Sequence, residues 1–176
     1  MAGARSERVF IIEDDPGVAE VVKLLLSREG YFVEGAGTVK EGLRRLAAGG
    51  FDLVITDLKL PDGTGLDAVR LIHGKDRSLP IIMMTSYSSL ESAIGALRAG
   101  AVDYIIKPFD NDELLHAVER ALKERRMGRE NATLRRTLSS AYASRPILGD
   151  SPGMKKALER MRITQLAMIE RMKRKA

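Results

Sequence analysis

Asp57 is the first candidate for a reactive residue in this sequence. It ends a largely apolar run, Phe51 to Thr56, and a loop containing Pro and Gly follows from Leu58 to Gly63. A short run of this kind indicates a buried strand that brings the carboxylate to one edge of a sheet. Two roles are then open for Asp57: it caps the following turn, or it takes part in a reaction.

Four more residues of reactive type follow predicted strands. They are Asp14 and Asp15 after the first apolar run, Thr85 after the fourth and Lys107 after the fifth. In a parallel α/β sheet, ligands bind outside the carboxyl ends of the strands, which share one edge. We therefore expect these four residues and Asp57 to form one site.

The charges of this predicted site call for a cation. Three carboxylates about 5 Å apart, those of Asp14, Asp15 and Asp57, repel by roughly 3 kcal/mol per pair at an effective dielectric constant near 20. Mg²⁺ prefers oxygen ligands of this kind. With the ammonium of Lys107 and the hydroxyl of Thr85, the set predicts phosphoryl transfer onto the Asp57 carboxylate. Alternatively, Lys107 is an ordinary lysine at a strand end, whose apolar methylene groups lie along the protein while its ammonium reaches water.

The elements that must position these residues alternate along the chain. The apolar runs predict strands at 8–12, 31–33, 51–57, 79–84 and 102–106, each followed by a helical pattern. Capping boxes at Thr38 with Glu41, and at Ser88 with Glu91, mark two of the helix starts. The alternation predicts an α/β fold with a doubly wound, five-stranded parallel sheet.

Two other enzyme classes use a similar scaffold, and the sequence disfavours both. Phosphohydrolases with an Asp nucleophile usually need a second acid two residues later, and that position is Lys59 here. Dinucleotide-binding domains carry G-x-G-x-x-G after the first strand, and this chain does not.

Four stretches together closely resemble the receiver domain of two-component response regulators, which has a flavodoxin-like fold. The stretches are Glu13 to Asp15, Thr56 to Pro61, Met84 to Ser86 and Ala99 to Phe109. The resemblance covers about residues 7 to 123. It implies that Asp57 accepts a phosphoryl group from a phosphohistidine of a sensor histidine kinase.

The resemblance also assigns the other site residues. Asp14, Asp15, Asp57 and the backbone carbonyl of Lys59 would hold Mg²⁺, and Lys107 would contact the phosphoryl group. The same resemblance implies a switch that repacks the surface formed by the fourth helix, fifth strand and fifth helix. Its members would be Thr85, which moves to the phosphoryl group, and Tyr104, which turns inward; a cis peptide bond is expected before Pro108.

The fifth helix is predicted to continue beyond the receiver. A short heptad seam favours a parallel coiled-coil dimer over an isolated charged helix; its members are Met127, Asn131, Leu134, Leu138 and Ala141. The predicted organisation is a receiver at 1–123, a helical linker at 124–145 and a basic helical tail at 146–176.

Residues 147–161 resemble the beginning of the AAA+ ATPase domain in NtrC-like activators of sigma-54 RNA polymerase. The chain contains no G-x-x-x-x-G-K-[ST] motif, so the only expected catalysis is the receiver's own phosphoryl transfer and dephosphorylation. Contact with DNA or RNA polymerase is then expected only through a missing or vestigial output domain. Residues 162–176 are either a remnant of that domain or a functional segment.

The charge distribution keeps two other functions open. Residues 1–119 contain 13 Lys and Arg against 19 Asp and Glu, whereas residues 120–176 contain 16 against 5. The alternatives to a dimeric transcription regulator are a short DNA-binding regulator that uses the basic tail, and a receiver-only protein-interaction module. The chain lacks Cys, a signal peptide and an apolar run of membrane-spanning length, which predicts a cytoplasmic protein without membrane contact.

Overall fold

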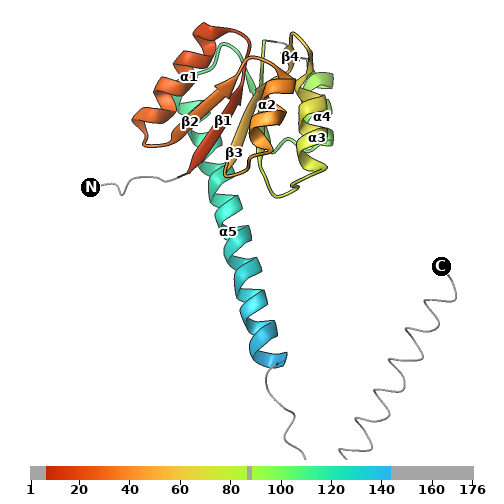
Figure 1. Ribbon diagram of the computed structural model, residues 1–176. Coiled ribbons are helices and arrows are strands. Elements are labelled where there is room, and N and C mark those ends of the chain that lie inside the picture. The colour runs from red at the N-terminus through yellow and green to blue at the C-terminus, as the bar shows by residue number, and fades with distance from the viewer. Residues whose placement is uncertain (1–6, 87–88, 144–176) are drawn as a thin grey trace, which may run out of the picture. The chain divides into compact units, whose positions relative to one another are not determined.

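The computed structural model describes residues 7–86 and 89–143, with side chains up to Thr137 (Figure 1). The predicted basic tail at 146–176 therefore lies outside the described residues. So do the predicted cap Ser88 and the side chains of the seam residues Leu138 and Ala141.

The sheet contains five parallel strands in the order β2-β1-β3-β6-β7. The strands are β1 (Arg8–Ile12), β2 (Phe32–Ala36), β3 (Leu53–Asp57), β6 (Ile81–Thr85) and β7 (Asp103–Ile106). The chain builds outward from β1 to β2 and then to β3 on the other side, which places the topological switch point between β1 and β3. The predicted doubly wound parallel fold is confirmed.

Helices cover both faces of this sheet. They are α1 (Pro16–Arg28), α2 (Val39–Leu46), α3 (Gly65–His73), α4 (Leu90–Ala99) and α5 (Asn111–Ala143). Residues of α1 and α5 pack in one core cluster with Ile55 of β3, whereas α2, α3 and α4 pack in the other with Val54. Successive side chains of the central strands therefore enter opposite cores, which explains why β3 and β6 are apolar without alternation.

Side-chain caps begin the helices at polar residues. The predicted cap Thr38 accepts a hydrogen bond from the Glu41 backbone N–H at 3.2 Å. The cap of α4 is Ser89, which accepts the Ser92 backbone N–H at 3.1 Å, and not the predicted Ser88. Because the first turn of α4 starts one residue later than predicted, Glu91 lies one position too early for the expected capping box.

A small hairpin occupies the stretch after Asp57 that was predicted as a loop. Its strands are β4 (Lys59–Leu60) and β5 (Gly63–Thr64), which pair antiparallel. At its turn, the Asp62 carboxylate accepts the backbone N–H groups of Val39 at 2.8 Å and Lys40 at 2.9 Å. The hairpin thus supplies a second cap to α2.

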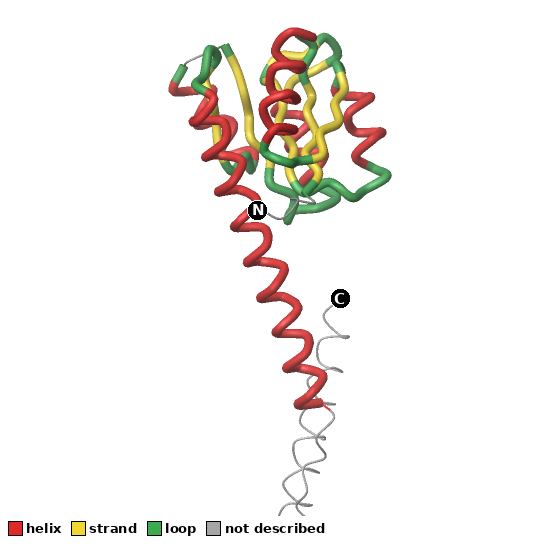
Figure 2. The backbone as a smooth tube through the Cα atoms, turned by 90° about the vertical axis from the view of Figure 1, so that its left-hand side faces the viewer, coloured by secondary structure: helices red, strands yellow, loops and turns green. Residues whose placement is uncertain are grey.

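Helix α5 is the long helix in the tube view (Figure 2). It continues through Gly128 without a break, so the predicted domain boundary at residue 123 lies inside a continuous helix. The chain divides into two compact units at Asn131 and Ala132. No helix within the described ranges is long and apolar enough to cross a membrane.

Candidate functional site

Lys107 connects two carboxylates at the carboxyl ends of three strands. Its Nζ donates to Asp57 Oδ2 at 2.6 Å and to Glu13 Oε2 at 2.5 Å. The exposed fractions of the side chains are 11% for Lys107, 13% for Asp57 and 1% for Glu13. Both ion pairs are therefore largely shielded from water. Charge-assisted hydrogen bonds are stronger in such a shielded site than in water.

The site gathers more negative charge than Lys107 can balance. One carboxylate oxygen from each of Glu13, Asp14 and Asp57 lies within 4.8 Å of the others. Three carboxylates and one ammonium leave an excess of two negative charges when all are ionised. An oxygen-rich cluster with this excess fits Mg²⁺, which typically takes one or two carboxylates and keeps several waters.

The structure gives Asp15 a different role from the one predicted. Its Oδ1 accepts the backbone N–H groups of Gly17 at 2.7 Å and Val18 at 3.1 Å, so Asp15 is the N-cap of α1. Glu13 takes its place in the acidic cluster. The sequence held the signal for this exchange: Pro16 favours the first helical position, which makes Asp15 the residue that caps the helix.

Burial and pairing shift the pKa values of the two paired residues. Burial raises the pKa of the Glu13 carboxyl, and this outweighs the opposite effect of the hydrogen bond from Lys107. Burial by itself lowers the pKa of Lys107, but the hydrogen bonds to Asp57 and Glu13 outweigh it and raise that pKa above its ordinary value. Lys107 is therefore charged at neutral pH.

Thr85 and Tyr104 come from neighbouring strands. Thr85 is fully buried at the end of β6, and its carbonyl accepts the Lys107 backbone N–H at 2.7 Å. The Tyr104 hydroxyl lies 2.9 Å from the Ser92 Oγ of α4. The peptide bond between Lys107 and Pro108 is cis, as expected.

The loop after Asp57 adds one residue that the sequence analysis did not single out. A Cβ on Gly65 would lie 2.1 Å from the Asp57 carbonyl oxygen, so only glycine fits there. On the other side of this loop, the Lys59 backbone N–H donates to Asp57 Oδ1 at 3.2 Å. The proposed metal contact of the Lys59 carbonyl stays a prediction.

Comparison with known families identifies the class. Residues 9–119 match the family model of the response regulator receiver domain. This chain therefore belongs to the response regulator receiver domain family.

The matched relatives are regulators. The chain is 38% identical over 149 residues to the response regulator protein PilR of Pseudomonas aeruginosa, a match that covers 85% of this chain and 32% of PilR. It is 35% identical over 156 residues to the C4-dicarboxylate transport transcriptional regulatory protein DctD of Rhizobium meliloti, covering 89% of this chain and 33% of DctD. It is also 31% identical over 146 residues to the DNA-binding transcriptional regulator NtrC of Proteus hauseri, covering 83% of this chain and 30% of NtrC, which confirms the predicted resemblance to NtrC-like regulators. The chain spans about a third of the length of these relatives.

Solved structures support the same assignment. A CheY-like receiver domain protein from Methanospirillum hungatei is 35% identical, with a TM-score of 0.67 and coverage of 70% of this chain and 99% of that one. The response regulator TrrA from Thermotoga maritima, solved in complex with Mg²⁺ and BeF, is 33% identical, with a TM-score of 0.61 and coverage of 65% and 98%.

Proposed function

We propose that Asp57 accepts a phosphoryl group from a phosphohistidine of a sensor histidine kinase. A carboxylate oxygen of Asp57 attacks the phosphorus, the bond from phosphorus to the histidine nitrogen breaks, and the imidazole leaves. The observation that carries this proposal is the pairing of Lys107 Nζ with Asp57 Oδ2 at 2.6 Å beside an acidic cluster. Lys107 is then placed to contact the transferred group, whose negative charge its ammonium stabilises.

The acidic cluster supports Mg²⁺ as the cofactor. Asp14 and Asp57 would hold the ion together with the Lys59 carbonyl, and Glu13 replaces Asp15 as the third acid of the site. When bound, Mg²⁺ neutralises charge on the carboxylates and on the phosphoryl oxygens. The Glu13 carboxylate also orients Lys107, because it accepts a hydrogen bond from the Lys107 Nζ at 2.5 Å.

Thr85 and Tyr104 form the proposed switch. Phosphorylation adds between one and two negative charges to a site already rich in carboxylate, so the active arrangement needs new donors. The hydroxyl of Thr85 would supply one of them, and Tyr104 would then leave its contact with Ser92 and turn inward. Both changes alter the surface between α4, β7 and α5.

The proposed output is a change in self-association that controls transcription. Met127 and Leu134 on α5 are 60% and 63% exposed, as expected for a seam that a second copy covers. We propose no contact of the receiver itself with DNA or RNA polymerase; such contacts would belong to an output domain.

Phosphorylation with acetyl phosphate tests the proposal. We expect mass spectrometry to find one added phosphoryl group in the wild type with Mg²⁺, and none in Asp57→Asn or in the presence of EDTA. Labelling that persists in Asp57→Asn would refute Asp57 as the acceptor. Light scattering with Mg²⁺ and beryllofluoride then asks whether the wild type, and not this variant, changes its association.

A further inference from the structure

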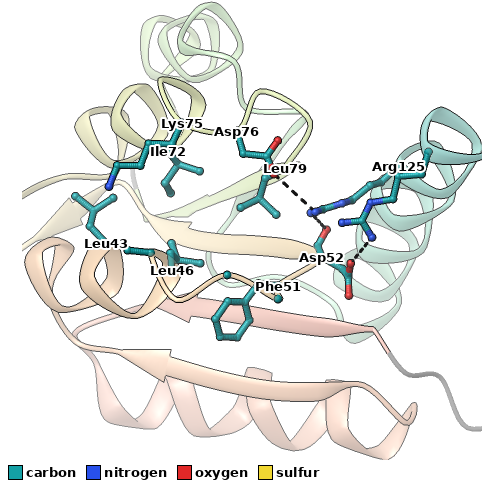
Figure 3. A pocket seen from close by; sticks show the side chains of 13 residues that line it. Leu43, Leu46, Phe51, Asp52, Ile72, Lys75, Asp76, Leu79 and Arg125 are labelled. Carbon is teal, nitrogen blue, oxygen red and sulfur yellow. Dashed lines mark hydrogen bonds and ion pairs between the residues drawn. The ribbon is translucent and has the colours of Figure 1, made fainter. Parts of the chain in front are cut away.

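A cavity of about 390 Å³ lies at the opposite edge of the sheet from Asp57, where β3 and β6 begin (Figure 3). Helices α2 and α3, the loops before β3 and β6, and α5 enclose it. Its apolar wall consists of Leu43, Leu46, Phe51, Ile72 and Leu79. The volume is near the lower end of the range for small-molecule sites, so the cavity fits a compact ligand.

Arg125 of α5 lines this cavity with a guanidinium that is incompletely paired. Its side chain is 5% exposed, and Nη1 donates to the Asp52 backbone carbonyl at 2.7 Å. Its guanidinium forms a long ion pair with Asp76, whose carboxylate oxygen lies 3.9 Å from Nη2, and Nε has no hydrogen-bond partner among the described residues. A buried cation with one neutral acceptor and one loosely placed carboxylate gains from a further anion.

The other charged groups of the cavity do not supply that anion. The Asp52 carboxylate is engaged by the Arg129 guanidinium at 2.9 Å and by the Arg8 backbone N–H at 3.0 Å. Burial lowers the pKa of Arg125, and the charge of Arg129 adds to this effect. Lys75 also lines the cavity, so three cations face only two carboxylates, those of Asp52 and Asp76.

We propose that this cavity binds a small organic monocarboxylate. The carboxylate would contact the guanidinium of Arg125 and balance the excess positive charge, and a compact apolar body would lie against the leucines and Phe51. An inorganic anion would leave the apolar wall unused, and an uncharged molecule would leave the cation unpaired. The site shares no residue with the phosphoacceptor site and does not depend on the proposed function.

A titration of the full chain with benzoate, followed by amide NMR shifts at constant ionic strength, tests this proposal. We expect saturable shifts at residues 46–52 and 75–79, and affinity at least roughly tenfold higher than for benzyl alcohol, the uncharged analogue. The proposal is overturned if these amides show no saturable shifts, or if benzyl alcohol binds as tightly as benzoate. It is also overturned if inorganic phosphate displaces benzoate at lower concentration than benzoate itself binds.

Variants at Arg125 and Lys75 assign the binding to the cations of the cavity, with Arg98→Met as the control. Arg125→Met keeps most of the length of the side chain but removes its charge, and it should lower the affinity for benzoate by about tenfold or more. The control Arg98→Met, on the exposed surface of α4, should leave the affinity for benzoate unchanged. Wild-type affinity in a folded Arg125→Met refutes the site. If circular dichroism shows that Arg125→Met does not fold, the exposed Lys75→Met decides: benzoate must bind a few-fold more weakly, and an unchanged affinity overturns the proposal.

Discussion

The adjacent residues Asp14 and Asp15, at the start of α1, have different roles. The carboxylate of Asp14 faces Glu13 and Asp57 in the acidic cluster, whereas that of Asp15 is used by backbone N–H groups of the helix. A helix N-terminus carries partial positive charge and unpaired N–H groups, so it holds a carboxylate without help from a metal. The two residues should therefore respond differently to substitution.

Mg²⁺ binding separates the roles of these aspartates. Asp14→Asn should lower the affinity for Mg²⁺ by about tenfold or more, because it removes a charged ligand from the cluster. Asp15→Asn should bind Mg²⁺ as the wild type does, since Asn is also a good N-cap. Isothermal titration calorimetry measures both. Equal losses in the two variants would show that Asp15, as the sequence first suggested, belongs to the metal site.

Asp62 should make stability depend on acid pH. The backbone hydrogen bond from Lys40, with a further one from Val39, holds the pKa of its carboxyl below the ordinary value of 3.8. The resulting stabilisation of α2 is present above pH 3.8 and is lost as pH falls through the lower pKa of the folded state.

Urea unfolding of the wild type and Asp62→Asn checks this expectation. The difference in the free energy of unfolding should be constant above about pH 5 and should shrink below the ordinary pKa, because the Asn variant has no carboxylate to titrate. A difference that does not change with pH would contradict the proposed capping by the ionised carboxylate.

At the scale of elements, the loop from β3 to α3 brings two backbone segments into contact beside the phosphoacceptor. The Gly65 backbone N–H donates to the Leu58 carbonyl at 2.9 Å, and the Gly65 Cα faces the Asp57 carbonyl closely enough to exclude a side chain. This close contact lets α3 begin directly after the short hairpin of β4 and β5. It also fixes the position of the Asp57 backbone.

Alanine substitutions at two glycines measure this contact. Gly65→Ala should destabilise the protein by about 3 kcal/mol or more, since the added methyl meets backbone rather than a flexible side chain. Gly128→Ala is the matched control within α5, where a Cβ meets no described atom within 4 Å. It should stabilise the helix by about 0.5–1 kcal/mol. Chemical denaturation with both variants gives the two values, and a mild effect at Gly65 would refute the close contact.

At the scale of the whole molecule, the sheet separates two charged regions. The acidic cluster lies at the carboxyl ends of the strands, and the cations of Arg125 and Arg129 lie at the amino ends beside Asp52. The two proposed ligands would therefore have opposite charges, a divalent cation at one edge of the sheet and an organic anion at the other. Helix α5 carries residues of the second site and also the predicted dimer seam.

Dimerisation through that seam is testable at Leu134. Leu134→Glu should shift the mass in solution towards the monomer, because a charge would be buried at a heptad core position. Arg136→Glu is the matched control, since Arg136 is exposed and lies two residues from Leu134, outside the seam. Light scattering at several protein concentrations measures the molecular mass of each variant. Equal masses for the two variants would show that the seam is not part of the dimer interface.

Local patterns in the sequence were sufficient to predict the five strands of the main sheet, the helices between them and the edge at which Asp57 meets Lys107, but not the small hairpin of β4 and β5. Apolar runs, caps at residues such as Thr38, and the polar residues that end each strand act over a few positions, so the sequence displays them directly. The same local information identifies Asp15 as a cap, because Pro16 favours the first helical position and the residue before that position is the N-cap. The one-residue error at Ser88 arose because neighbouring serines are equally good caps.

Contacts between distant parts of the chain were decided only by the tertiary structure. The pairing of Glu13 with Lys107, the capping of α2 by Asp62 and the contact of Arg125 with Asp52 each join residues far apart in sequence. No local pattern specifies such a partner, because the partner is set by how strands and helices pack. The sequence by itself therefore determined the class of protein and its phosphoacceptor candidate, and packing decided which acid faces Lys107 and where the cavity beside Arg125 forms.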